Sequence, residues 1–185
     1  VLLEPLAEDL ARAGLPRVNV SLDTLDRDRF ARMSGRDRLP QVLSGLAAAA
    51  SVGLGPIKIN AVLLRGENED EAVDLVRFGR ESGFEVRFIE FMPLENGDTW
   101  DLGRVVSGAE VKGRIEALWP LQPDPAGDPR APAHRFVFRD GGGAVGFINS
   151  VTEPFCGHCG RIRLTSDGKL RVCLYDSNET DLKSL

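Results

Sequence analysis

All cysteines of the chain lie in one stretch, "FCGHCGRIRLTSDGKLRVCL", at residues 155–174. Cys156 and Cys159 form a CxxC pair, and Cys173 follows later in the same stretch. Thiolates at this spacing bind metals or carry out redox chemistry. Because the chain has an odd number of cysteines, three, a closed disulfide framework cannot use every thiol. A reducing compartment, the cytoplasm, fits this composition better.

Four interpretations compete for these thiols. The CGHC sequence matches disulfide isomerases, but their first cysteine opens a helix, whereas a β pattern with an Asp167-Gly168 turn follows here. Structural zinc requires four ligands, so His158, His134 or another chain would have to contribute. Buried, inert thiols are a third interpretation. In the fourth, three thiolates hold a [4Fe–4S] cluster and leave one iron open to a substrate, so that three cysteines are a complete set.

Two arginines follow the CxxC pair directly. Arg161 and Arg163 alternate with Ile162, so we expect both guanidinium groups on one face of a single strand. Two parallel guanidinium forks suit a polyphosphate. The alternative is an ordinary strand face in water.

The elements that must position these residues begin with a βα alternation. Strands are expected at 17–22, 57–64 and 85–92, and helices at 5–13, within 26–35, at 41–52 and at 68–83, the last with Asn68 as its cap. This rhythm predicts βαβ units, a parallel sheet and an arc of a (β/α) barrel. Chemistry in such barrels lies at the carboxyl ends of strands, which directs attention to Ser21, Asp23 and the segment from Glu90 to Met92.

The pattern changes after Pro93. Residues 94–103 are expected as a loop, 107–119 as a helix capped by Ser107, and 134–150 as an antiparallel hairpin around a Gly-Gly-Gly turn. A second hairpin, around Asp167-Gly168, would place Cys173 on its return strand. We predict an α/β segment over residues 1–93 and a covering α+β subdomain over residues 94–185.

Charge and hydropathy narrow the classes of partner. The net charge of -5 argues against non-specific nucleic-acid binding, so an anionic substrate must be met by local basic residues. The sequence contains no apolar run near the roughly 20 residues of a membrane-spanning helix. The amino end lacks the pattern of a secretory signal. A cytoplasmic protein without membrane or nucleic-acid partners is therefore expected.

At the level of whole motifs, the stretch at 155–174 resembles the carboxyl-terminal cluster motif of the GTP 3′,8-cyclase family. This is the molybdenum cofactor biosynthesis protein A family of the radical S-adenosylmethionine superfamily. "RVNVSLDTLD", "MSGRD", "IKINAVLLRGENEDE" and "VRFIEFMPL" resemble further family signatures in the same order, so the resemblance covers residues 1–185. It implies the later strands of a partial TIM-like radical-SAM barrel, followed by a subdomain whose hairpins carry a second cluster.

The resemblance also implies residue roles, whereas Asp23 and Glu90 receive none. Three residues would hold the second [4Fe–4S] cluster, four would bind GTP, and two would line S-adenosylmethionine. The matched positions are Cys156, Cys159 and Cys173 for the cluster, Lys58, Arg161, Ile162 and Arg163 for GTP, and Ser21 and Met92 for S-adenosylmethionine.

The implied activity is that of a lyase. A first [4Fe–4S] cluster in such enzymes cleaves S-adenosylmethionine, and the resulting radical abstracts hydrogen from the ribose C3′ of GTP. C3′ then bonds to C8 of guanine, giving (8S)-3′,8-cyclo-7,8-dihydroguanosine 5′-triphosphate. The resemblance further implies a homodimer that hands its product to cyclic pyranopterin monophosphate synthase.

Parts of the family pattern are not found. The 185 residues contain no CxxxCxxC motif for the first cluster, lack the first three βα units and the tail ending in Gly-Gly, and have Gly160 where the family usually has Asn. We therefore expect a fragment that supplies the GTP side and the second cluster and is inactive alone. The alternative is a zinc-stabilised binding module without catalytic activity.

Overall fold

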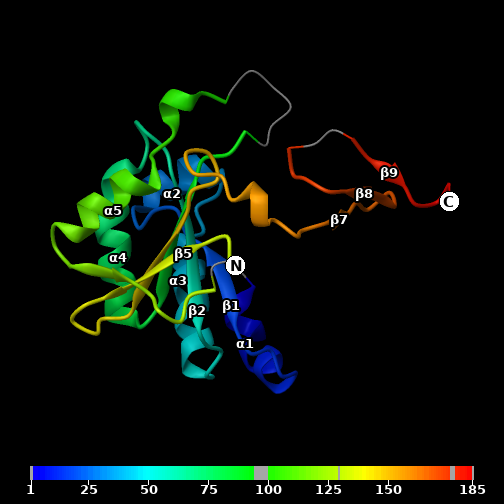
Figure 1. Ribbon diagram of the computed structural model, residues 1–185. Helices are drawn as coiled ribbons and strands as arrows, with labels where there is room; N and C mark the ends of the chain where they lie inside the picture. The colour runs from blue at the N-terminus through cyan, green and yellow to red at the C-terminus, as the bar shows by residue number, and fades with distance from the viewer. Residues whose placement is uncertain (1, 94–99, 129, 176–177, 185) are drawn as a thin grey trace.

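The computed structural model describes the chain except residues 1, 94–99, 129, 176–177 and 185 (Figure 1). Within that part, a six-stranded sheet has the strand order β1-β2-β3-β6-β5-β4, and a three-stranded sheet has the order β7-β8-β9. The fold is mixed α/β with a mostly parallel central sheet, in agreement with the predicted fold class at that level. The barrel geometry of the full prediction remains a prediction.

The parallel strands are those that the βα rhythm indicates. β1 (Val18–Ser21), β2 (Ile57–Leu63) and β3 (Glu85–Glu90) pair in parallel in that order. β6 (Ala144–Ile148) adds a further parallel strand on the other edge of β3. The carboxyl ends of the four strands therefore lie along the same edge of the sheet.

The helices of the first half confirm the predicted alternation. They are α1 (Leu3–Arg12), α2 (Arg27–Ser34), α3 (Leu39–Ser51) and α4 (Ala72–Ser82), the last preceded by the 3₁₀ turn η1 (Glu69–Glu71). Gly83 ends α4 with a φ of 73°, a left-handed conformation that favours glycine. The predicted cap role of Asn68 is wrong, because its buried side chain instead bonds the backbone of Asp23, Val62 and Leu64. None of the helices in the described ranges is both long and apolar enough to cross a bilayer.

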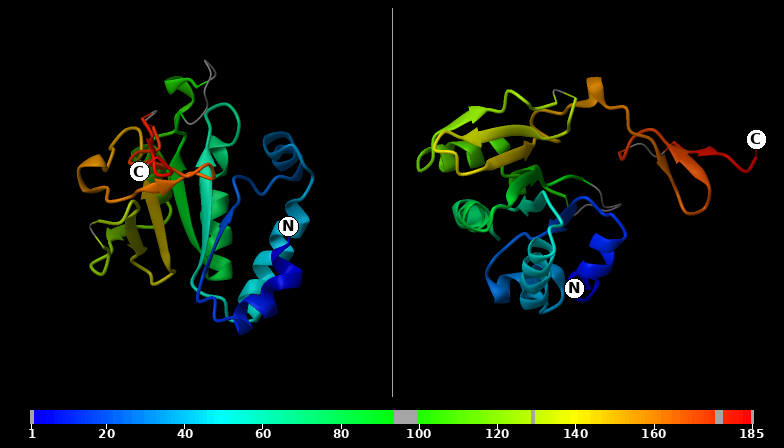
Figure 2. Two further views of the ribbon diagram at one scale, coloured as in Figure 1. Left: turned by 90° about the vertical axis from the view of Figure 1, so that its right-hand side faces the viewer. Right: turned by 90° about the horizontal axis from the view of Figure 1, so that it is seen from below.

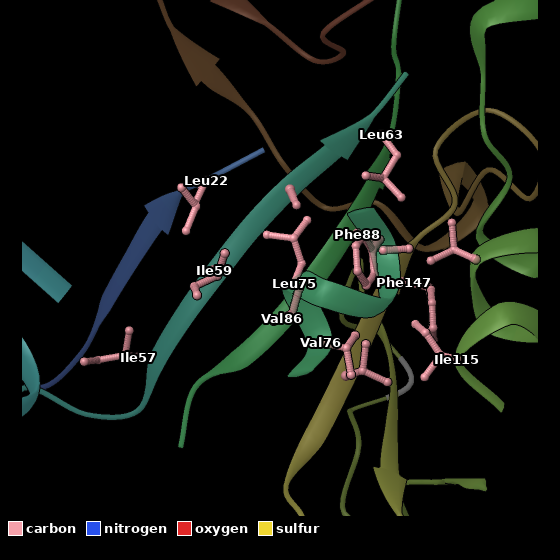
Figure 3. Close-up of a cluster of buried hydrophobic side chains, with 14 of the residues drawn as sticks. Leu22, Ile57, Ile59, Leu63, Leu75, Val76, Val86, Phe88, Ile115 and Phe147 are labelled. Atoms are coloured by element: carbon pink, nitrogen blue, oxygen red, sulfur yellow. The ribbon is translucent and has the colours of Figure 1, made fainter. Parts of the chain in front are cut away.

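The two faces of the sheet differ because successive side chains of a strand point in opposite directions. One face is packed beneath the helices and carries the hydrophobic core, with Ile59, Phe88 and Phe147 almost fully buried (Figure 3). The rings of Phe88 and Phe147 stack at a centroid distance of 6.2 Å. The other face carries Asn19 and Lys58 and is only partly covered. We call it the open face.

The second half extends the same sheet. α5 (Gly108–Glu116) begins at the predicted cap, where Ser107 accepts a hydrogen bond from the Glu110 amide. β5 (His134–Phe138) and β6 form the predicted antiparallel hairpin, and β4 (Leu121–Pro123) pairs with β5. β4 was not predicted, because it is three residues long in a proline-rich stretch. Residues 94–99 of the predicted loop lie outside the described residues, and Leu102–Arg104 form the 3₁₀ turn η2.

The division into residues 1–93 and 94–185 remains a prediction. The pairing of β3 with β6 joins the two segments within one sheet.

The carboxyl-terminal arm, defined as residues 154–175 and 178–184, projects from the body of the molecule (Figures 1 and 2). It contains the 3₁₀ turn η3 (Cys156–His158), β7 (Arg163–Leu164), β8 (Lys169–Arg171) and β9 (Thr180–Asp181). The predicted hairpin is confirmed by the antiparallel pairing of β7 and β8. Two details of the prediction are wrong, because Arg161 precedes β7 and Cys173 follows β8. The strands are shorter than the sequence pattern indicates.

Candidate cluster and nucleotide site

A cavity of about 570 Å³ lies between the open face of the sheet and the carboxyl-terminal arm. The sheet contributes polar and aliphatic side chains, and the arm contributes the cysteines, two arginines and an aromatic pair. The principal lining residues are Asn19, Asn60, Ile89, Met92, Ile148, Ser150, Phe155, Cys156, Cys159, Arg161, Arg163, Cys173 and Tyr175. The three thiols and both arginines therefore face one space.

The thiols are free in this structure, and their exposure excludes one of the four interpretations of the cysteines. Cys156 and Cys159 are exposed and Cys173 is half-buried, so the interpretation as buried, inert thiols is wrong. Among the described residues, no three or more His, Cys, Asp or Glu side chains converge on one metal-ion position. Thiolates that hold an iron–sulfur cube bind different iron atoms and need not converge on one point. Three free thiols around a common cavity are chemically suited to such a cluster.

Arg161 lies directly against the CxxC pair. Its Nε donates to Cys159 Sγ at 3.3 Å, and its guanidinium carbon lies 4.9 Å from the ring centroid of Phe155. The backbone amide and side chain of Arg161, with a smaller contribution from Arg163, lower the pKa of Cys159 below its usual value. This environment favours the thiolate, the form that binds metals.

Lys58 lies in a neighbouring cavity of about 320 Å³, which shares the lining residues Pro132 and Ile148 with the first. Its Nζ lies 3.9 Å from Glu85 Oε1. Burial lowers the pKa of Lys58, Glu85 opposes this shift, and the nearby Arg87 adds to the lowering. Lys58 thus belongs to a positively charged group on the open face, close to the cysteine cavity but not in its lining.

The other predicted site residues are distributed unevenly. Met92 and Arg163 line the cysteine cavity, as their predicted roles require. Ile162 is 68% exposed and does not line this cavity. Ser21 is exposed at the end of β1 and pairs in register with Asn60, whose side chain does line it. The predicted roles of all these residues remain predictions.

Asn19 and Asn60 are cavity residues that the sequence analysis missed. The Oδ1 atom of Asn60 is buried and has no hydrogen-bond partner among the described residues. A buried amide oxygen without a partner costs free energy, and this one belongs to a residue that lines the cavity. The sequence did contain a signal for both residues. Asn19 lies two positions before Ser21 and Asn60 two positions after Lys58, so each is a polar residue on the same face of its strand as a residue already singled out.

With this geometry in place, the comparisons with known proteins define the class. Residues 84–185 match the Molybdenum Cofactor Synthesis C family, and residues 1–79 match the Radical SAM superfamily. Because the first match covers more than half of the chain, the chain belongs to the Molybdenum Cofactor Synthesis C family. The family resemblance that the motifs carried is therefore confirmed.

Particular relatives have more specific names. The GTP 3′,8-cyclase of Moorella thermoacetica is 45% identical over 184 residues, which are 99% of this chain and 56% of the relative. That of Rhodopirellula baltica is 46% identical, with 99% and 52% covered. The GTP 3′,8-cyclase 2 of Mycobacterium tuberculosis is 46% identical, with 95% and 50% covered. The chain spans about half the length of the curated relatives it matches.

Proposed function

We propose that the chain forms the nucleotide side of a GTP 3′,8-cyclase, a radical-SAM lyase of molybdenum cofactor biosynthesis. The observation that carries the proposal is the single cavity lined by Cys156, Cys159, Cys173, Arg161 and Arg163. It brings together a thiolate set that suits a [4Fe–4S] cluster and a guanidinium pair that suits a polyphosphate. Relatives named GTP 3′,8-cyclase align with almost the whole chain.

The arginines bind and orient the substrate in this proposal. A guanidinium presents a planar fork that pairs with phosphate oxygens, so Arg161 and Arg163 hold the triphosphate end of GTP. Lys58 adds a charge from the neighbouring cavity, and Ile162 contributes a further contact. Of the four proposed GTP residues, Arg161 and Arg163 line the cavity, whereas Lys58 and Ile162 would act from its surroundings.

The thiols hold the opposite end of the site. Cys156, Cys159 and Cys173 would hold the cluster, which would supply a Lewis-acidic iron for the guanine base. Ser21 and Met92, at or just beyond the carboxyl ends of β1 and β3, would line S-adenosylmethionine. When bound, S-adenosylmethionine and its own cluster supply the one-electron chemistry that joins ribose C3′ to guanine C8.

Asn60 supports a polar ligand in this position. Its buried Oδ1 atom lacks a donor among the described residues, and a hydroxyl or amino group of a bound nucleotide or of S-adenosylmethionine would provide one once the amide turns toward the cavity that Asn60 lines. Hydrogen bonding to this atom would remove the cost of leaving it unpaired. An entirely apolar ligand could not donate a hydrogen bond to this atom.

Anaerobic reconstitution separates this proposal from a zinc-stabilised binding module. We expect a brown protein that binds about four irons per chain through the three cysteines, with broad absorption near about 400 nm from iron–sulfur charge transfer. Replacing all three cysteines by serine should remove those irons. A colourless protein that holds about one zinc through the same residues would contradict the proposal.

The proposal extends to partners. The product would pass to cyclic pyranopterin monophosphate synthase, and the protein would act as a homodimer in the cytoplasm. Size-exclusion chromatography with light scattering tests the dimer. A monomer at micromolar concentration would contradict that part alone.

A further inference from the structure

The carboxylate of Glu90 accepts hydrogen bonds from two segments that follow it in the chain. It is 3% exposed and lies at the end of β3, on the helix-covered face, where it pairs in register with Leu63. Its Oε1 accepts from the Gly108 amide at 3.0 Å, at the start of α5. Its Oε2 accepts from the amides of Val151 and Thr152, each at 2.8 Å, and the Thr152 hydroxyl donates to Oε1 at 2.5 Å.

These contacts hold the turn that leads to the first cysteine pair. Val151 and Thr152 follow β6 and come just before Pro154 and Phe155, which open the carboxyl-terminal arm. Glu90 binds this turn on the helix-covered face of the sheet. The arm that follows the turn contributes its cysteines to the cavity on the open face. Glu90 therefore fixes the point from which the arm departs.

A second connection reaches the third cysteine. The Ser150 hydroxyl donates to the backbone oxygen of Glu90 at 3.4 Å, and the Tyr175 hydroxyl is hydrogen-bonded to the Ser150 side chain. The amide of Tyr175 lies 3.4 Å from Cys173 Sγ. The start of the cysteine-bearing segment is thus bonded directly to Glu90, and its end is linked to Glu90 only through Ser150.

We propose that Glu90 is a positioning residue that fixes the cysteine-bearing segment, residues 150–175, against the end of β3, so that the three sulfurs face the cavity beside Met92. This inference rests on the proposed function, because it concerns the geometry of the cluster ligands. Groups that hydrogen-bond metal ligands orient those ligands and raise metal affinity, and Glu90 would act one step further out, through the backbone that carries the ligands.

The charge state of Glu90 agrees with this role. Burial alone raises the pKa of Glu90, but the hydrogen bonds from Thr152, Gly108 and Val151 outweigh it and lower the pKa below its ordinary value. At neutral pH the side chain is therefore an ionised, acceptor-only group facing four donors. Glutamine at this position would turn an amide donor toward backbone N–H groups, so the turn would lose its fixed place.

Glu71 provides a matched control for a buried carboxylate. It is 7% exposed and accepts from the Thr24 hydroxyl, the Leu25 amide at 2.7 Å and Arg29. Its partners belong to the segment after β1 and to α2, and among the described residues they form no hydrogen bond with the cysteine-bearing segment. Glu71→Gln should destabilise the fold without loosening the cysteines.

The test measures how fast the iron held by the three cysteines passes to a ferrous chelator under anaerobic conditions. That iron is defined as the fraction that disappears when all three cysteines are serine. Glu90→Gln should release it several-fold to about tenfold faster than the wild type, at the low end of the range for groups bonded directly to a ligand, because Glu90 acts through the backbone of the turn. Thr152→Val, which removes one donor of an exposed side chain, should show a smaller acceleration. Glu71→Gln should release iron at the wild-type rate.

The results distinguish a failure of the inference about Glu90 from a failure of the proposed function. Wild-type release rates in both Glu90→Gln and Thr152→Val would overturn the inference, as would an equal acceleration in Glu71→Gln. If Glu90→Gln does not fold, Thr152→Val decides the question. If the triple serine variant keeps all the iron of the wild type, the cysteines hold no cluster, and the proposed function fails together with this inference.

Discussion

Arg161 Nε donates to Cys159 Sγ at 3.3 Å, so a group suited to phosphate lies against a thiol suited to iron. The same guanidinium rests 4.9 Å from the ring centroid of Phe155. Stacking on an aromatic ring limits the orientations of the fork while leaving its outer N–H groups free to donate. The nucleotide and cluster parts of the site are thus coupled through one residue.

The arginine pair should carry much of the affinity for the triphosphate. Arg161→Ala should weaken GTP binding by about 1.5–3 kcal/mol, the range for a hydrogen bond to a charged group, and Arg163→Ala should have a similar effect. Equilibrium dialysis of the protein against labelled GTP measures this change. Arg139→Ala, at an exposed position that does not line the cavity, is the control and should bind GTP normally. Unchanged affinity in the double variant would place both arginines on an ordinary solvated surface.

Lys58 should contribute through its charge. Lys58→Gln should reduce GTP affinity by about tenfold, or about 1.4 kcal/mol, because the lysine adds to a positive group close to the cavity. The loss should shrink at high salt, which screens charge interactions. Lys112→Gln is the matched control, since Lys112 pairs with Glu116 on α5. Equal losses in the two variants would show that only net charge matters.

Gly108 and Gly113 lie on the same helix and should respond oppositely to alanine. A Cβ at Gly108 would lie 1.9 Å from Asn149 Oδ1, whereas a Cβ at Gly113 would meet nothing within 4 Å. Gly108→Ala should therefore destabilise the fold by about 1–3 kcal/mol through overpacking. Gly113→Ala should stabilise it by about 0.5–1 kcal/mol, because glycine is a poor helix former.

Urea unfolding curves of the two variants measure these changes. Adding Asn149→Ala to Gly108→Ala removes the clashing side chain and should recover part of the loss. A shift of the same sign in both single variants would contradict the close approach of α5 to Asn149.

The contribution of Glu90 to stability should depend on pH in a defined direction. Its folded-state pKa lies below the ordinary value of 4.5. Above pH 4.5 the carboxylate is ionised in both states, and its hydrogen bonds contribute fully to the free energy of unfolding. As the pH falls through the folded-state pKa, the group protonates and that contribution is lost.

The measurement for Glu90 is the difference in unfolding free energy between the wild type and Glu90→Gln. It should be constant from neutral pH down to about pH 5.5 and shrink below pH 4.5. A difference that grows as the pH falls would show that the hydrogen bonds do not stabilise the charged form.

Periodicity predicted the parallel strands β1, β2 and β3 and most helices, because a βα rhythm leaves a strong local signal, but it did not predict the parallel pairing of β6 with β3. It failed where tertiary contacts decide. Asn68 looked like a helix cap, yet its side chain bonds the backbone of Val62 in β2 and of the segments that follow β1 and β2. β4 has only three residues, which are too few to show an alternating pattern. It is a strand because it pairs with β5, and the sequence does not reveal that pairing.

The candidate site was predicted unevenly for a similar reason. The cysteines and arginines stand out because their types and spacing already indicate chemistry. Glu90 was noticed at a strand end but had no assigned role, because its donors come from α5 and from the turn after β6. Contacts between residues that lie far apart in the chain leave no signal in the local sequence pattern.

The most direct test of the central claim is whether cluster and nucleotide share one site. GTP affinity should be measured anaerobically for the reconstituted protein and for the variant in which Cys156, Cys159 and Cys173 are serine. The account predicts that affinity falls by about tenfold or more in the serine variant, because the open iron and the ordered arm are lost together. GTP affinity that is unchanged by loss of all three cysteines would contradict it.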